Sequence, residues 1–391
     1  MRYKDINIDF LYHSVVNGDF MLPDCGNTQE RMLGVFRLTD DFREVYGNYI
    51  IQNYPNGAGV RDAIEAIKKY KHLEEVNIDT HRDLIVDFMY SKSVLGFATY
   101  EYFSYGLENK SIEDRLTFMK HRNIFQYYGT LNTDVNCIRK LGSKYNTYST
   151  FKRYFKREII RVRNGTDKEK LQAFASTHDS FMIKPVGSAL GKGIRLIRAT
   201  DYVSIDELFT DIFQDGTVVC EELIIPHSSF VRINPSCVNT VRIFTYYNGK
   251  AVTIVCAWMK AGRGNAVVDN AGAGGMLAAI DEATGVVITD AADEAGGNYK
   301  THPDTGFVFK GFQIPQWSEA IKIVKAMAPQ LPGVPLIGWD LALSADKGWQ
   351  VIEGNEGGQI SLIQIPHKKG MLKELTERFE WEKHKKAANK K

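Results

Sequence analysis

Apolar residues recur at helical spacing through the first third of the chain. In one stretch, lysines face away from a single apolar stripe formed by Ala63, Ile64, Ile67 and Tyr70. A second stretch repeats the spacing at Leu84, Ile85, Phe88 and Met89. We find no internal repeat and no chemical motif in this part. Residues 1–131 are therefore predicted to form a mainly helical accessory or recognition domain.

The pattern changes to short β-strands after about residue 171. Apolar runs between Phe181 and Thr289 alternate with glycine turns, and Asn248-Gly249 lies between two such runs as a strong hairpin signal. Helices are predicted over residues 205–213 and 316–331. Strands with interspersed helices favour an α+β fold over a doubly wound sheet. The charged residues 374–391 are expected to form a frayed, solvated helical tail.

Composition narrows the class of protein. The 391 residues, 44% hydrophobic and 25% charged, are typical of a globular protein with two or three packed units. A net charge of +2, from 49 Lys+Arg against 47 Asp+Glu, provides no overall field for nucleic acid, so any anion site must be local. The five cysteines form no CxxC pair, and charges interrupt the first ten residues where a signal peptide would be apolar. We therefore expect a cytoplasmic protein without an integral membrane segment.

A glycine-rich loop lies between two predicted strands, residues 181–185 and 194–197. Its glycines allow backbone N–H groups to surround an anion, and Lys184 and Lys192 supply positive charge. Four loop residues carry this interpretation: Gly187, Ser188, Gly191 and Gly193. The spacing fits neither a Walker A loop nor a Rossmann fingerprint. A nucleotide triphosphate is the natural ligand, although the loop alone is equally consistent with an ordinary hairpin turn.

Two strand-like runs, residues 338–344 and 349–355, are predicted to form a hairpin. If Asp346-Lys347 is the centre of the turn, Asp340 lies opposite Glu353, and Asn355 shares their face. The opposite, core-facing side is then formed by Trp339, Leu341, Leu343 and Ile352. Two carboxylates and an amide oxygen suit Mg²⁺, which prefers hard oxygen ligands shared with substrate phosphates. The alternative is a solvent-exposed polar face.

Together these motifs resemble the ATP-grasp superfamily. The Lys-Pro and glycine-rich segment is followed by Gly-Trp-Asp and by Ile-Glu-Gly-Asn, in that order. The runs at residues 238–243, 268–275 and 353–359 are similar to the sugar-transfer-associated ATP-grasp proteins, and the resemblance covers about residues 132–366. It implies two α+β subdomains that hold ATP between them. These would be residues 132–225, with the glycine-rich loop, and residues 226–373, with the metal site.

The resemblance also implies roles for single residues. Lys184 and Lys144 would contact phosphates together with the glycine-rich loop, and the segment with Glu221, Glu222 and Ile224 would hold adenine. The acid that usually binds ribose is not evident after this segment.

Other matching positions point to the reaction itself. Arg242 would neutralise the transferring phosphoryl group, and the magnesium ligands would be Asp340, Glu353 and Asn355. Arg263 would line the acceptor site. Asn270 and the glycines after it would place backbone N–H groups around an acyl phosphate, although a flexible glycine-rich loop is equally consistent with these residues. Lys260 is as consistent with the acceptor site as with a solubilised loop, and the same holds for Arg263.

The expected function is an ATP- and Mg²⁺-dependent carboxylate–amine ligase, with Mn²⁺ as a substitute metal. It would form an amide through an acyl phosphate and ADP, joining an amino acid or amine to a carboxylated saccharide or related molecule. Two alternatives remain open: a kinase of a small-molecule or sugar hydroxyl, and a non-catalytic nucleotide-binding protein in surface-polymer assembly. No oligomeric state follows from the sequence.

Overall fold

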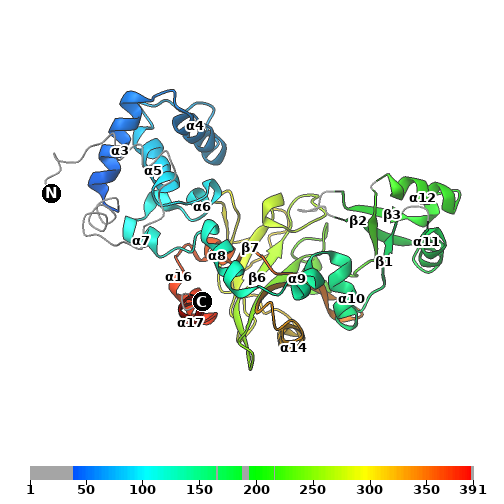
Figure 1. The fold of residues 1–391 in the computed structure, drawn as a ribbon. Coiled ribbons are helices and arrows are strands. Elements are labelled where there is room, and N and C mark those ends of the chain that lie inside the picture. The colour runs from blue at the N-terminus through cyan, green and yellow to red at the C-terminus, as the bar shows by residue number, and fades with distance from the viewer. Residues whose placement is uncertain (1–37, 164–165, 187–192, 215, 389–391) are drawn as a thin grey trace. The chain divides into compact units, whose positions relative to one another are not determined.

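The computed structural model describes residues 38–163, 166–186, 193–214 and 216–388 (Figure 1). The described chain separates into two compact units. One comprises the chain up to residue 123 together with residues 294–297 and 368–372. The other comprises residues 124–293 and 298–367 and the chain from residue 373 onward. In the part of the chain that the structure describes, we find no helix with the length and apolar character needed to cross a membrane.

The first unit is helical, as the apolar spacing predicts. Its described elements are α3 (Asp40–Asn53), α4 (Ala58–Lys71), α5 (Arg82–Ser93), α6 (Thr99–Ser104), the 3-10 helix η2 (Leu107–Asn109) and α7 (Ile112–Leu116). Helix α4 buries Ala63 and Ile67 as expected, and ends at His72 in the left-handed conformation. Aromatic side chains fill much of the interior; Tyr70 stacks on Phe103 with ring centroids 4.4 Å apart.

A buried ion pair crosses this helical unit. Arg115 on α7 donates from Nη2 to Asp87 Oδ2 at 3.0 Å and from Nη1 to Ser91 Oγ at 2.8 Å. Tyr102 and Arg43 donate to the same carboxylate, at 2.7 and 2.8 Å. The pair therefore connects four elements of the helical unit through one carboxylate.

The second unit contains two antiparallel sheets, which confirms the α+β fold. The smaller has the order β1-β4-β2-β3, with β1 (Ile159–Val162), β4 (Val218–Glu222), β2 (Ser180–Pro185) and β3 (Arg195–Arg198). Helices α11 (Lys168–Ala175) and α12 (Ile205–Phe213) cover its apolar face; α12 has the bounds that the sequence predicts. Their core includes Phe181, Ile183, Leu171, Ile212 and Val218.

The larger sheet has seven strands in the order β11-β10-β5-β6-β7-β8-β9. Its strands are β5 (Thr240–Tyr247), β6 (Val252–Ala261), β7 (Met276–Ile280), β8 (Ala291–Ala292), β9 (Asn298–Tyr299), β10 (Leu336–Ser344) and β11 (Gly348–Asn355). Alternate residues such as Ile243, Met259 and Leu341 face a core shared with α10 (Lys144–Phe155) and α14 (Trp317–Met327). Residues between them in sequence, such as Arg242, Lys260 and Asp340, project to the other face of the sheet.

Shorter elements complete this unit. They are α8 (His121–Leu131), α9 (Val135–Leu141), η3 (Ala199–Asp201), α13 (Ser228–Val231), η4 (Ala271–Ala273), η5 (Ala328–Gln330), η6 (Ile360–Ile363), α15 (Gln364–His367), α16 (Leu372–Arg378) and α17 (Trp381–Ala388). The predicted helix over residues 316–331 corresponds to α14 followed by η5. The predicted hairpin at Asn248-Gly249 joins β5 to β6.

The β10–β11 hairpin confirms one prediction and corrects another. Asp340 is paired with Glu353, as expected, but Ser344 pairs with Gly348, so the turn is centred on Asp346 rather than on Asp346-Lys347. A β-bulge at Ile352 absorbs the difference of one residue. The prediction that Ile352 faces the core is therefore wrong; Val351 occupies that place and is fully buried.

The prediction of a frayed, solvated tail is also wrong for the described part of residues 374–391. Leu375 and Phe379 are fully buried, and Trp381 is nearly so. The Trp381 ring meets Tyr127 of α8 edge to face, with centroids 4.6 Å apart. A few apolar residues among many charges give this segment a packed face, because one turn of helix brings Leu375 and Phe379 to the same side.

We predict that Arg115→Met destabilises the helical unit by about 3 kcal/mol, because it removes one partner of a buried ion pair. Urea unfolding at equilibrium measures the effect. Lys68→Met is the matched control, since its 3.9 Å pair with Glu65 lies at the surface and contributes less than about 1 kcal/mol. Equal stability of the two variants would contradict the prediction.

Candidate functional site

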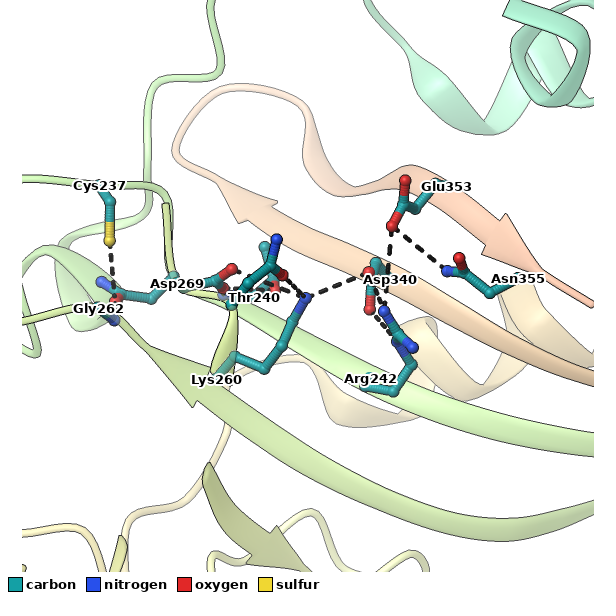
Figure 2. Close-up of polar contacts among 11 residues, drawn as sticks. Cys237, Thr240, Arg242, Lys260, Gly262, Asp269, Asp340, Glu353 and Asn355 are labelled. Carbon is teal, nitrogen blue, oxygen red and sulfur yellow. Dashed lines mark hydrogen bonds and ion pairs between the residues drawn. The ribbon is translucent and has the colours of Figure 1, made fainter. Parts of the chain in front are cut away.

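Polar side chains form a row across four neighbouring strands of the larger sheet. Asp340 on β10 is paired with Glu353 on β11 and with Arg242 on β5. Thr240 is paired with Lys260 on β6. Because partners in an antiparallel pair project to the same face, all these side chains lie on the face opposite the core. Figure 2 shows Arg242 and Lys260 pointing toward Asp340 from two strands.

Asp340 is the centre of this row and is 2% exposed. The Arg242 guanidinium donates to both of its carboxylate oxygens, from Nε to Oδ1 and from Nη2 to Oδ2, the latter at 2.6 Å. Lys260 Nζ lies 3.2 Å from Oδ2. Burial alone would raise the pKa of Asp340, but the charges of Arg242 and Lys260 outweigh it and hold that pKa well below its usual range. Asp340 is thus a carboxylate shared by two cations.

Glu353 and Asn355 complete the row on β11. Asn355 Nδ2 donates to Glu353 Oε1 at 3.3 Å, and Arg242 Nη2 lies 4.0 Å from the same oxygen. The three predicted metal ligands therefore share one face. Among the residues that the structure describes, no three His, Cys, Asp or Glu side chains cluster as metal ligands would; the predicted set differs in having an amide as its third ligand.

Lys260 belongs to the row, although the sequence alone does not distinguish a place in the site from a place on a solvated loop. Its ammonium group also lies 3.7 Å from Asp269 Oδ1 and donates to Asn270 Oδ1 at 3.4 Å. Asp269 in turn accepts from the N–H and the hydroxyl of Thr240, at 2.8 and 2.6 Å. The predicted acyl-phosphate residue Asn270 is thus linked to the row through a buried lysine.

The chain between Asp269 and Gly275 is folded tightly against itself. A Cβ atom at Gly275 would stand 2.2 Å from the Asp269 carbonyl oxygen, so only glycine fits there. Arg263, predicted to line the acceptor site, makes an ion pair with Asp293 at 3.0 Å and donates to Tyr299 Oη at 2.7 Å. These contacts connect it to β8 and β9 rather than to the row.

A second polar cluster lies on the smaller sheet. Lys184 Nζ on β2 donates to Glu221 Oε2 on β4 at 2.7 Å. Arg157 Nη2 donates to the same oxygen at 3.2 Å. Burial raises the pKa of Glu221, but the charges of Lys184 and Arg157 outweigh it and bring the pKa to about 2. The Glu221 carboxylate, placed by the sequence beside adenine, therefore positions the predicted phosphate-binding lysine.

The remaining predicted nucleotide residues have the following places. Glu222 accepts from Lys347 and from the Glu158 N–H, and Ile224 is half-buried just after β4. Lys144 is the first residue of α10, directly after its N-cap Ser143.

The glycine-rich loop is described only at its ends. Its strands are paired as predicted, with Ile183 opposite Arg195. Gly193 has φ +72°, and a Cβ there would meet Pro185 at 2.8 Å. Four predicted loop residues lie outside the described residues: Gly187, Ser188, Gly191 and Lys192.

Several solved structures of enzymes match this chain at low sequence identity. The ATP-grasp ligase PsnB, complexed with a minimal precursor, has a TM-score of 0.36 and 12% identity, over 60% of this chain and 57% of its own. D-cycloserine synthetase DcsG has a TM-score of 0.41 and 14% identity, over 74% of this chain and 82% of its own. An L-amino acid ligase from Bacillus licheniformis has a TM-score of 0.35 and 12% identity, over 62% of this chain and 48% of its own.

The family assignment rests on a different match. No curated protein matches the chain. The family model for sugar-transfer associated ATP-grasp proteins matches residues 100–380, which is well over half of the chain. It includes both polar clusters and the strands that carry them. The chain therefore belongs to the sugar-transfer associated ATP-grasp family, which confirms the resemblance seen in its motifs.

Proposed function

We propose that this protein is an ATP- and Mg²⁺-dependent carboxylate–amine ligase. The observation that carries the proposal is the buried row in which Arg242 and Lys260 share Asp340 beside Glu353 and Asn355. Burial of cations against carboxylates costs desolvation and often stabilises a fold no better than apolar packing does, so a role in binding is the better account of this row. The two cations are suited to a site that receives phosphates with a metal ion.

The charges of the row support this role. Arg242 and Lys260 carry two positive charges, and the acids Asp269, Asp340 and Glu353 carry three negative charges. A divalent cation bound by Asp340, Glu353 and Asn355 would leave the row with one net positive charge. That excess favours an anion such as the γ-phosphoryl group of ATP. The oxygen donors of Asp340, Glu353 and Asn355 fit Mg²⁺, which would offset the negative charge of bound phosphates.

The proposed reaction has two steps. In the first, a substrate carboxylate oxygen attacks the γ-phosphorus, its bond to ADP breaks, and an acyl phosphate forms. Arg242, Lys260 and Lys184 stabilise the charge on the transferring group. In the second, an amine attacks the acyl carbon, phosphate leaves with the bonding electron pair, and the amine loses a proton. Asn270, linked to Lys260, stands beside this intermediate.

The protein contributes orientation and electrostatics, and no covalent nucleophile is required. The nucleotide would lie between the smaller sheet, in residues 132–225, and the larger sheet, in residues 226–373. Glu221, Glu222 and Ile224 border the adenine, and Lys144 reaches a phosphate. The family's association with sugar transfer supports a carboxylated saccharide as one substrate and an amino acid or amine as the other. Such a reaction belongs in the cytoplasm, where ATP is available.

The proposal predicts that ADP release depends on a carboxylate and an amine together. A screen of uronic acids and amino acids with ATP and Mg²⁺ should reveal a pair that accelerates release of ADP and inorganic phosphate in equal amounts. Mass spectrometry should then find a conjugate lighter by one water than the two substrates. Phosphate found on an acceptor instead would identify a kinase. Nucleotide binding without accelerated turnover by any pair would contradict an enzymatic role.

A variant with both Asp340→Asn and Glu353→Gln should lose at least about 10³-fold in kcat, because positioned charge contributes factors of this size in buried sites. Steady-state phosphate release measures the loss. Glu319→Gln, on the exposed surface of α14, is the control and should keep wild-type kcat. Full activity of the double variant would contradict the metal site.

Lys260→Met should lower kcat by about 10²-fold with a small effect on folding. Arg242 still pairs with Asp340, and Thr240 still donates to Asp269, so neither carboxylate loses all its partners. Kinetics of phosphate release and thermal unfolding are measured on the same preparation. Lys322→Met, an exposed residue of α14, is the matched control. A Lys260→Met enzyme with unchanged kcat would exclude this lysine from the reaction.

A further inference from the structure

Arg157 connects the polar cluster on the smaller sheet to the larger sheet, although no sequence motif contains it. It lies between α10 and β1, and its side chain is 1% exposed. One end of its guanidinium, Nη2, donates to Glu221 on β4 at 3.2 Å. The other, Nη1, donates to the Val351 carbonyl on β11 at 2.8 Å. Arg157 therefore bridges the smaller sheet and the strand that carries Glu353 and Asn355.

One end of this bridge contacts Glu221, and the acceptor at the other end, Val351, lies two residues before Glu353. Glu221 Oε2 accepts from Arg157 and from Lys184 at the same time. Two cations thus compete for one oxygen, so a phosphate that draws charge from Lys184 strengthens the hold of Glu221 on Arg157. At the other end, Val351 is the last regularly paired residue before the bulge that sets Glu353 opposite Asp340.

The chemistry of Arg157 favours a positioning role over simple stability. Its Nε is buried and has no partner in the described structure, and its guanidinium lies 5.0 Å from the Phe155 ring centroid. A buried charge that is incompletely paired stabilises a fold little, and apolar residues often replace such groups without loss. A rigid planar fork, however, is suited to hold two acceptors on separate strands at a fixed spacing.

We propose that Arg157 is a positioning residue that couples nucleotide binding at Lys184 to metal binding at Glu353 and Asn355. The proposal rests on the proposed function. By linkage, a metal ion on β11 then raises the affinity for ADP on the smaller sheet, and the reverse. Lys347 supplies a comparison at the same joint: it pairs with Glu222 and connects the β10–β11 turn to β4, but it does not contact Lys184.

The test measures the dissociation constant of ADP by calorimetry, in EDTA and in saturating MgCl2, for wild type, Arg157→Lys and Lys347→Met. The ratio of the two constants reports the coupling. Chelation of Mg²⁺ by ADP in solution is identical for all three proteins, so differences between ratios belong to the protein. Arg157→Lys keeps a cation beside Glu221, which protects folding, but a single ammonium cannot bridge both acceptors. Thermal unfolding verifies that all three proteins are folded.

We expect the wild-type ratio to fall by about fivefold or more in Arg157→Lys, which is the low end of ordinary coupling between sites, and to stay within about twofold in Lys347→Met. An unchanged ratio in Arg157→Lys overturns the proposal, as does an equal loss in Lys347→Met. A wild-type protein that binds no ADP overturns both this proposal and the proposed function. A wild-type protein with clear coupling that Arg157→Lys retains overturns only the role of Arg157.

Discussion

The carboxylate of Asp340, buried in the face of an antiparallel sheet, is the constraint on which the site depends. A charge in this position needs partners, because desolvation of an isolated carboxylate costs several kcal/mol. Arg242 and Lys260 supply them from two neighbouring strands. The same two cations are then held in fixed positions beside the proposed metal ligands. The pairing with Arg242 and Lys260 offsets the cost of burying Asp340, and it also fixes the two positive charges that a phosphoryl group would contact.

Side chains alternate between the two faces of the larger sheet, so apolar residues pack on one face and the polar row lies on the other. Ile243 and Leu341 face the core, whereas Arg242 and Asp340, their neighbours in sequence, face the other side. The smaller sheet repeats this division, with Ile183 in its core and Lys184 on Glu221. Each polar cluster therefore has a rigid apolar layer directly beneath it. Side chains held in this way lose little further freedom when a ligand arrives.

Much of the fold and part of the site could be predicted from the sequence. The predicted pairing of Asp340 with Glu353 is confirmed because two deviations cancel: the turn centred on Asp346 shifts the register by one residue, and the bulge at Ile352 restores it. Lys260 could not be placed, since β5 and β6 are joined by a longer loop than Asn248-Gly249 alone implies and contain a bulge of their own. Arg157 could not be found at all, because its two acceptors are 64 and 194 residues away. The spacing of apolar residues predicts which residues share a face of one helix or strand. It does not predict contacts between residues far apart in the sequence, which depend on how the sheets assemble.

The bulge at Ile352 changes which residues of β11 face the core and which face the polar side of the sheet. Before the bulge, the side chains of Trp349 and Val351 face the core. After it, the side chains of Glu353 and Asn355 face the same side as Asp340. A regular strand of the same length, without the bulge, would bring Ile352 opposite Asp340 and place Glu353 opposite Trp339, in the apolar layer. The irregular backbone at Ile352 therefore keeps Glu353 on the polar face of the sheet, whereas exchange of the half-buried Ile352 side chain for another would leave both alternations intact.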